Sequence, residues 1–375
     1  MRNLEFPVIG TRLQAPGALA IGGQAKVSHL KEKFDVNSPA GRKKYFRAKA
    51  GDEISHIKKY LKKNTFIAYF LGKKGSGKGT YSKLLTEIFG EDKIKHISIG
   101  DIVRDVHKEL ETKKGRKTVE EFLHKRYRGY ISVEEGINAI LGRSTEKVSV
   151  PNEVMLALIE REIDKHRGKA LFIDGFPRTL DQVSYSLYFR DLMGYRDDPD
   201  IFALIDIPES VIDARIKTRV ICPECFISRN TRLFPTSKIG YDKANKEFFL
   251  ICDNSECKGY GRTKLVAKEG DHLGIEPIRS RLMTDEEILR TAFSLHGVPK
   301  VLMRNHVLVS EASKYFDEYE LTPEYIYKWN GRNEVVEVIE KPWTVKDDNG
   351  KKCYSLLPAP VVVSFLKQLP EALDL

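Results

Sequence analysis

Short apolar runs alternate with helical patterns through much of the chain. The runs are rich in β-branched and aromatic side chains, which is typical of strands buried on both faces. They lie at residues 65–71, 95–99, 169–176 and 201–207. Helical patterns are found at residues 43–63, 81–88, 152–166, 208–219 and from residue 276 onward. This alternation of strands and helices predicts an α/β fold with a parallel sheet.

The first predicted strand leads into a glycine-rich loop. Residues 64–80 read NTFIAYFLGKKGSGKGT. Loop N–H groups and the N-terminus of the following helix favour an anion, and Lys78 would add a point charge for the β- and γ-phosphates of a nucleotide. The spacing from Gly72 to Lys78 fits a phosphate-binding loop, but Gly79 stands where a magnesium-binding hydroxyl belongs and Thr80 follows. A glycine-rich turn without a ligand is the alternative, but the flanking strand and helix favour a nucleotide site.

Charged residues follow three other predicted elements. Arg104 lies one turn into a helix that Asp101 could cap, and it could clamp an anion or be only a surface residue. Asp174 ends a strand beside the loop, which is a place for a group that holds Mg²⁺ directly or through water; a turn-forming role is the alternative. Arg215 and Arg219 project from one helical face and could grip a transferring phosphoryl group, or could simply be solvated.

Four of the five cysteines form two pairs in a loop-rich segment. Cys222 and Cys225 have C-x₂-C spacing, and Cys252 and Cys257 follow with a looser C-x₄-C spacing. Four thiolates can bind a tetrahedral zinc, which would replace the missing core of such a small unit. Chance pairs or a redox couple are the alternatives. Cys353 is expected to be a small buried hydrophobic residue.

Composition and charge narrow the class of protein. The 375 residues can form about two or three domains, and a content of 41% hydrophobic and 31% charged residues is typical of a globular protein. The net charge of +10 suits polyanions such as nucleotides or nucleic acid, although much of it can be solvated lysine. No apolar run approaches the about 18 residues of a membrane span, and no leader is recognisable at the N-terminus. We expect a cytoplasmic chain.

The motifs and their order resemble the adenylate kinase family of nucleoside monophosphate kinases, in its zinc-bearing long-lid form. Residues 72–80 resemble the family's loop GxPGSGKGT, with Lys74 in place of the proline. Residues 100–104 resemble GDxLR, residues 148–153 resemble LVPDE, and residues 174–182 are nearly identical to DGFPRTxxQ. The resemblance covers residues 65 to about 282.

The resemblance implies an α/β architecture of several parts. These are a P-loop NTPase three-layer core with a parallel β-sheet, an NMP-binding insert and a zinc-binding lid insert. The implied boundaries are an N-terminal extension at 1–63, a core at 64–98, 158–219 and 273–340, an acceptor insert at 99–157, a lid at 220–272 and a C-terminal extension at 341–375. Beyond residue 298, alternating segments such as 335–339 predict further strands, and no motif there indicates a chemistry.

The resemblance also implies roles for individual residues. Those expected to bind ATP are Gly75, Ser76, Gly77, Lys78, Gly79, Thr80 and Arg215. Those expected at the AMP site are Ile99, Arg104, Val150, Gly175, Arg178, Gln182, Lys268 and Arg281. Catalysis is expected from Lys78, Arg178, Arg215, Arg219 and Arg281. Asp174 is expected to hold Mg²⁺ through water, and Cys222, Cys225, Cys252 and Cys257 to hold a structural Zn²⁺.

Several residues depart from the family pattern. Ile99 replaces a threonine, which removes a hydroxyl near the acceptor base. The lid motif R-x-D-D appears as residues 268–271, so that Lys268 replaces an arginine and Gly270 an aspartate. The next arginine of the pattern is Arg279 by spacing and Arg281 by hydrophobic phase. These changes affect the expected choice of acceptor and the energetics of the lid more than the expected phosphoryl transfer.

The expected reaction is the Mg²⁺-dependent conversion of ATP and AMP to two ADP by a monomer. Neither a membrane nor a nucleic acid is expected as a partner. One alternative is a kinase for another monophosphate (CMP, UMP or GMP), which Ile99 leaves open. Another is a basic, zinc-containing nucleic-acid binder that uses ATP for conformational switching. The ordered series of acceptor motifs favours the kinase.

Overall fold

The computed structural model describes residues 32–142, 150–176, 192 and 194–375. The chain divides into two compact units. The sheet unit consists of Lys43–Ile205, Arg281–Met303 and Val362–Leu375. The cysteine unit consists of the chain up to Arg42, Asp206–Ser280 and Arg304–Val361.

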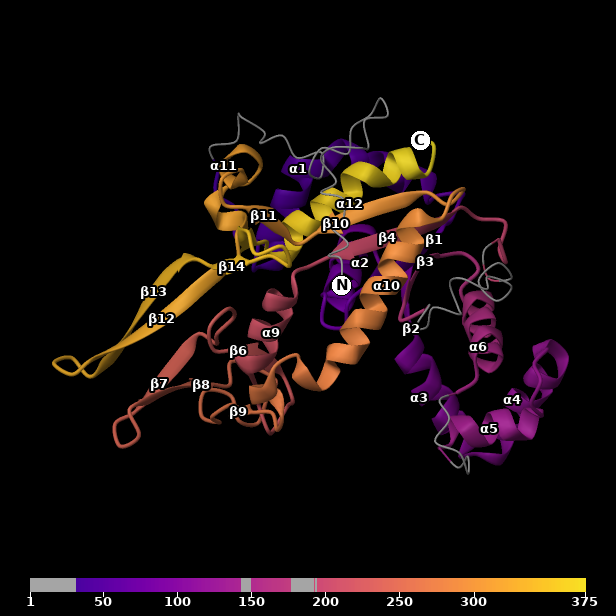
Figure 1. Cartoon of the computed structure of the whole chain (residues 1–375), viewed down its shortest axis with the longest axis horizontal. Helices are drawn as coiled ribbons and strands as arrows, with labels where there is room; N and C mark the ends of the chain where they lie inside the picture. Colours follow the sequence, from indigo (N-terminus) through magenta and orange to yellow (C-terminus); the bar gives the residue numbers. More distant parts are fainter. Residues whose placement is uncertain (1–31, 143–149, 177–191, 193) are drawn as a thin grey trace. The chain divides into compact units, whose positions relative to one another are not determined.

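The sheet unit is built on a parallel sheet, which confirms the predicted α/β fold. Among the described residues, five strands lie side by side in the order β10-β4-β1-β3-β2 (Figure 1). Their bounds are Ile67–Gly72 (β1), Ile94–Ser98 (β2), Ala170–Asp174 (β3), Asp200–Asp206 (β4) and Lys300–Arg304 (β10). β1 pairs in parallel with β3 and β4, and β2 pairs in parallel with β3. The predicted strands at 65–71, 95–99, 169–176 and 201–207 therefore all form.

Helices cover both faces of this sheet. Successive side chains of a strand point to opposite faces, so Phe70 and its neighbour Tyr69 face different layers. On one face, the ring of Phe70 and the ring of Phe172 on β3 pack against Phe365 of α12. On the other face, Tyr69 belongs to a buried cluster with Leu158 of α6 and residues from α3 and α10. The result is a layer of helices, a sheet and a second layer of helices, which is the predicted three-layer core.

The helices begin close to the predicted positions. Those with residues in the sheet unit are α1 (Pro39–Tyr60), α2 (Lys78–Phe89), α3 (Ile99–Leu110), α4 (Lys113–Arg126), α5 (Val133–Ile140), α6 (Asn152–Lys165), α10 (Arg279–Ser294) and α12 (Pro358–Ala372). Helix α3 begins two residues before Asp101, and its N-cap residue is Ser98. Asp101 therefore lies inside the first turn, and the expectation that it caps this helix is wrong.

The cysteine unit consists of small sheets and short helices. Its strands are β5 (Arg219–Ile221), β6 (Ser228–Asn230), β7 (Lys238–Asp242), β8 (Glu247–Ile251), β9 (Val266–Ala267), β11 (His306–Leu308), β12 (Pro323–Asn330), β13 (Val335–Pro342), β14 (Thr344–Lys346) and β15 (Lys352–Ser355). Its helices are α9 (Glu209–Lys217), α11 (Ala312–Tyr315) and the 3₁₀ turns Asp271–Leu273, Glu276–Ile278 and Glu318–Glu320. The predicted strand at 335–339 is part of β13.

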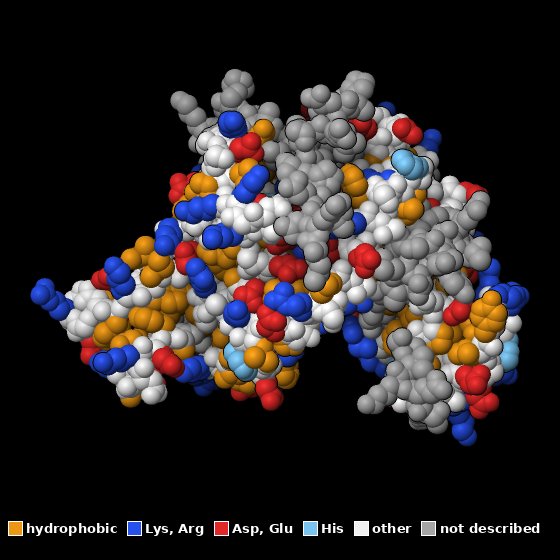
Figure 2. Space-filling model, in the orientation of Figure 1, with side chains coloured by type: hydrophobic (Ala, Val, Ile, Leu, Met, Phe, Trp, Pro, Cys, Tyr) orange, Lys and Arg blue, Asp and Glu red, His pale blue; other side chains and the backbone are white. Residues whose placement is uncertain are grey.

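Within the cysteine unit, the hairpin β7–β8 packs against the hairpin β12–β13. Tyr241 of β7 and Trp329 of β12 stack with ring centroids 4.7 Å apart and an interplanar angle of 19°. Phe248 of β8 lies 5.6 Å from Tyr327, again between ring centroids. Figure 2 shows hydrophobic side chains gathered where these hairpins lie side by side. Two hairpins that are far apart in the sequence thus share one aromatic cluster.

The predicted domain boundaries remain predictions, because the compact units group the chain differently. Residues 304–361 belong to the same unit as the four paired cysteines, whereas residues 362–375 belong to the sheet unit. The packing of Phe365 on the sheet accounts for the second assignment. In the described part of the chain, no helix has the length and apolar character that crossing a membrane requires.

Candidate active site

The loop between β1 and α2 has the geometry of an anion-binding turn. Gly75 and Gly77 have φ angles of +85° and +99°, a conformation that glycine adopts without the steric cost of a side chain. A Cβ atom on Gly72 would lie 2.8 Å from Ser76 Oγ and 3.0 Å from Ile205 Cβ, so this position also requires glycine. Since α2 begins at Lys78, its first N–H groups open toward the loop.

Lys78 lies at the centre of this turn. Its Nζ donates to the carbonyl oxygens of Gly72 (2.8 Å) and Lys73 (3.3 Å) and lies 3.8 Å from Asp174 Oδ1. The side chain of Lys78 is 15% exposed and that of Asp174 is 19% exposed. A partly buried ammonium held at a phosphate-binding loop can pair with phosphate oxygens.

The parallel register brings the predicted site elements to one edge of the sheet. Asp174 lies opposite Phe70 of β1 and Ser98 of β2. The phosphate loop, Gly175 and the start of α3 at Ile99 therefore leave the sheet at its carboxyl edge. In open α/β sheets, ligands bind at this edge.

Asp174 also faces a histidine. His96 Nε2 lies 3.9 Å from Asp174 Oδ2. Burial lowers the pKa of His96, and the negative charge of Asp174 opposes this shift. Among the described residues, a neutral His96 leaves Lys78 as the cation that pairs with this carboxylate, whose oxygens are the ligand type that Mg²⁺ prefers.

Four predicted acceptor-site residues have different surroundings. Arg104 is largely exposed, with 66% of its side-chain surface accessible, and pairs with the Asp101 carboxylate one turn earlier. Ile99 is 2% exposed and belongs to the buried core cluster, against which the half-buried Val150 also packs. Gly175 has a φ angle of +89°. Two other predicted acceptor-site residues, Arg178 and Gln182, lie outside the described residues.

In the cysteine unit, Arg219 is held by a bidentate ion pair. Its Nε and Nη2 donate to the two carboxylate oxygens of Asp271, both at 2.6 Å. These bonds raise the pKa of the guanidinium, and Asp271 is buried. Arg215 lies in α9, which ends at Lys217, whereas Arg219 begins β5, so the expectation that these two arginines project from one helical face is wrong. Arg215 is half-buried, and Lys268 is exposed. Asp271 is the one aspartate that this chain keeps from the lid motif R-x-D-D, and its partner is Arg219.

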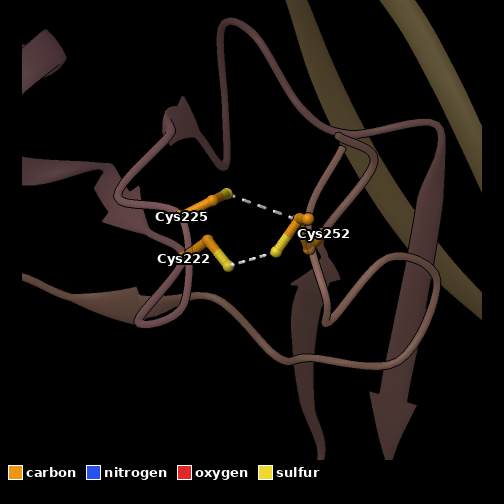
Figure 3. Close-up of side chains that lie close together, drawn as sticks. Cys222, Cys225 and Cys252 are labelled. Atoms are coloured by element: carbon orange, nitrogen blue, oxygen red, sulfur yellow. Dashed lines mark hydrogen bonds between the residues drawn. The ribbon is translucent and has the colours of Figure 1, made fainter. Parts of the chain in front are cut away.

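The four paired cysteines converge on one point. Figure 3 shows that the side chains of Cys222, Cys225 and Cys252 point toward one another. The Sγ atoms of Cys222 and Cys257 are 3.9 Å apart, those of Cys225 and Cys252 are 3.8 Å apart, and all four lie within 4.8 Å of one another. All four are free thiols.

This donor set fits zinc. Thiolates around a tetrahedral zinc, with Zn–S bonds of about 2.3 Å, lie about 3.8 Å apart. A hydrogen bond from the Ile227 N–H lowers the pKa of Cys225 to about 6, whereas burial raises that of Cys252 to about 12. A bound cation would stabilise the thiolate that burial disfavours. Three of the cysteines form a small core with Leu250 and Leu265, so a metal would add the cross-link that this core lacks.

Comparison with known proteins identifies the family. A family model described as an AAA domain matches residues 71–220. An adenylate kinase of Thermotoga petrophila is 33% identical over 203 residues, which are 54% of this chain and 73% of that protein. An adenylate kinase of Thermotoga neapolitana is 30% identical over 236 residues, 63% of this chain and 87% of that protein. The adenylate kinase of Clostridium botulinum is 32% identical over 200 residues, which are 53% and 76% of the two chains.

The chain belongs to the adenylate kinase family. It is a nucleotide kinase, and therefore a phosphotransferase. The resemblance that the motifs predicted is thus confirmed at the level of the family, and the roles of the individual residues stay predictions.

One residue of this kinase was missed by the sequence reasoning. Asp285 of α10 accepts a hydrogen bond from the Lys74 backbone N–H of the phosphate loop and contacts Arg281. The spacing of Arg281 and Asp285 by four residues on a predicted helix was a signal for their ion pair. The contact with the loop had no local signal, because these two segments are far apart in the sequence.

Proposed function

We propose that this kinase transfers the γ-phosphoryl group of ATP to AMP and so forms two molecules of ADP. The observation that carries the proposal is the position of Lys78 in the phosphate loop, next to Asp174 and at the sheet edge where the acceptor motifs also begin. Phosphoryl transfer requires mainly positioning and charge neutralisation, which this arrangement can supply without a covalent intermediate.

On the donor side, the loop amides and Lys78 would bind the β- and γ-phosphates. The loop residues proposed to contact ATP are Gly75, Ser76, Gly77, Gly79 and Thr80. In this role, Lys78 exchanges its hydrogen bonds to the Gly72 and Lys73 carbonyls for bonds to phosphate oxygens. Asp174 would orient water on Mg²⁺, and the ion would neutralise charge on the phosphates.

On the acceptor side, arginines would bind the phosphate of AMP. Arg104 and Arg178 are proposed for this contact, and the exposed guanidinium of Arg104 is available after exchange of its Asp101 partner. Gln182 would read the adenine, with backbone contacts from Val150 and Gly175. Lys268 and Arg281 would also belong to the AMP site, and Arg215, Arg219 and Arg281 would stabilise the charge of the transferring group. We also propose that the reaction takes place in the cytoplasm and that the kinase is a monomer.

One observation favours a second candidate, a kinase for CMP, UMP or GMP. Ile99 is buried in the core cluster, so this position offers the acceptor base neither a hydroxyl nor an exposed side chain. A site that lacks such a hydrogen bond discriminates less strongly among bases. Gln182 supports AMP as the first choice.

The test is chromatographic analysis of the products formed from ATP and Mg²⁺ with each monophosphate in turn. We expect rapid formation of ADP with AMP and slow reaction with CMP, UMP and GMP. Faster reaction with one of the other three would overturn the choice of AMP and support the second candidate. If no monophosphate is phosphorylated, the proposed function is wrong.

A further inference from the structure

The buried carboxylate of Asp285 connects two parts of the donor site. Its Oδ2 accepts a hydrogen bond from the Lys74 backbone N–H at 2.8 Å, and its Oδ1 lies 2.9 Å from Arg281 Nε. The side chain of Asp285 is 7% exposed, whereas that of Arg281 is 39% exposed. Each carboxylate oxygen thus has a different donor, one in the phosphate loop and one in α10.

The next residue of α10 contacts the same loop. Lys73 Nζ lies 3.4 Å from Glu286 Oε2, and the Lys73 side chain is 6% exposed. An ammonium group that is removed from water to this extent requires a charged partner. Glu286 Oε1 also lies 2.6 Å from Arg290 Nη2, one turn later in α10, so a second cation holds this carboxylate in place. Two successive loop residues, Lys73 and Lys74, are therefore attached to two successive residues of α10.

The bridge to Asp285 depends on a departure from the family loop. The motif that residues 72–80 resemble has a proline at position 74, and proline has no backbone N–H. Lysine at this position supplies the N–H that Asp285 accepts. The donor is thus a feature of this chain's own loop sequence.

We propose that Asp285 is a positioning residue that fixes the phosphate loop and the Arg281 guanidinium in one arrangement. The proposal rests on the proposed function, in which the loop binds the donor phosphates and Arg281 stabilises the transferring group. A hydrogen bond between a charged carboxylate and a loop N–H restricts the loop to the conformation that presents its other amides. The ion pair between Asp285 Oδ1 and Arg281 Nε restricts the conformations that the Arg281 side chain can adopt.

The first test replaces Asp285 with its neutral isostere. Asp285→Asn keeps the shape of the side chain but places an amide N–H₂ against one of the two donors and removes the charge. We expect the dissociation constant of MgATP, measured by calorimetry, to rise about ten-fold and kcat to fall by a similar factor. Glu287→Gln is the matched control, because it removes the same charge from an exposed position of the same helix. It is expected to change neither quantity.

The second test removes only the loop donor. Lys74→Pro leaves the carboxylate and Arg281 intact, so we expect a higher MgATP dissociation constant with little change in kcat. In an Asp285→Ala background, which offers the Lys74 N–H no acceptor, the same proline should have no further effect on MgATP binding. If the two effects on the dissociation constant multiply, or if Asp285→Asn binds and turns over like the wild type, the proposal is wrong. If Asp285→Asn does not fold, Lys74→Pro decides: a raised dissociation constant supports the bridge, and an unchanged one overturns it.

This design separates the proposal from the proposed function. MgATP binding requires no acceptor, so the binding series remains informative for a wild-type protein that phosphorylates no monophosphate. Failure of transfer to AMP with the expected binding pattern would overturn the function but support the bridge. Transfer to AMP without the expected binding pattern would support the function and overturn the bridge.

Discussion

The ammonium of Lys78 lies 3.8 Å from a carboxylate oxygen of Asp174, where the phosphate loop and the end of β3 meet. Asp174 ends β3, and Lys78 begins α2 after the loop that follows the neighbouring parallel strand β1, so the pairing of β1 with β3 brings the two side chains together. Burial of both side chains strengthens the pair relative to one in water. The site therefore holds its central cation in place before any nucleotide binds.

Replacement of Lys78 by Met should lower turnover on the order of 10²–10³-fold or more, because the variant loses the charge that neutralises the transferring phosphate. The measurement is kcat for ADP formation at saturating ATP. Lys83→Met is the matched control, since Lys83 is an exposed lysine of the same helix. Near-wild-type kcat in Lys78→Met would refute the donor-site assignment.

The cysteine cluster should contain one zinc per chain in a freshly purified, folded protein. Metal analysis by mass spectrometry checks this number. Cys252→Ser should lose most of the zinc and unfold at a lower temperature, because a bound metal would stabilise the folded cysteine unit. Cys353→Ala is the control, since Cys353 is buried outside the cluster and should keep the metal. A folded wild-type protein without zinc would reject this account of the cluster.

The stack of Tyr241 on Trp329 should couple the hairpins β7–β8 and β12–β13 energetically. A double-mutant cycle with Tyr241→Ala and Trp329→Ala is expected to give a coupling of about 0.5–1.5 kcal/mol in the free energy of unfolding. Chemical denaturation provides the measurement. The same cycle between Trp329 and Tyr260, which is 56% exposed in the same unit, should give a value near zero. Equal coupling in both cycles would argue against a specific contact.

Asp200 should make stability depend on pH. Burial raises the pKa of this carboxyl to about 6, and the negative charge of Asp198 raises it further. The hydrogen bond from the Gly194 N–H and the positive charge of Arg196 lower it and so oppose the shift. The folded state therefore binds the proton more tightly than the unfolded state, whose pKa is about 3.9. Stability from this group is present below about pH 4 and is lost as pH rises through about 6.

The matching variant is Asp200→Asn, which keeps an oxygen for the Gly194 N–H and carries no charge. Its advantage in unfolding free energy over the wild type should be larger at pH 8 than at pH 4, by on the order of 1–3 kcal/mol. Denaturant titrations of both proteins at the two pH values give this difference. The contributions of the other titrating groups are the same in the two proteins and cancel. An advantage that does not change with pH would contradict the assignment.

Local patterns predicted the elements that meet at the sheet edge. The strand before Gly72, the helix after Lys78 and the acid at Asp174 each had a short-range signal, and parallel pairing brings such strand ends together. The cysteine spacing likewise predicted a convergence that the structure confirms.

Contacts between distant segments could not be predicted in this way. The hydrogen bond from Lys74 to Asp285 and the stack of Tyr241 on Trp329 each join segments whose pairing depends on the whole fold. Aspartate is common at helix N-caps, which predicts Asp101 as the cap of α3, whereas Ser98 occupies this position.

Phosphoryl transfer to AMP can be measured by following the labelled γ-phosphate of ATP. The kinase is incubated with γ-labelled ATP, Mg²⁺ and AMP, and the products are separated by chromatography. We expect label to appear in the β-phosphate of newly formed ADP, at a rate that Lys78→Met lowers on the order of 10²–10³-fold or more. Label that appears only in inorganic phosphate, with or without AMP, would contradict this expectation and would indicate an ATPase.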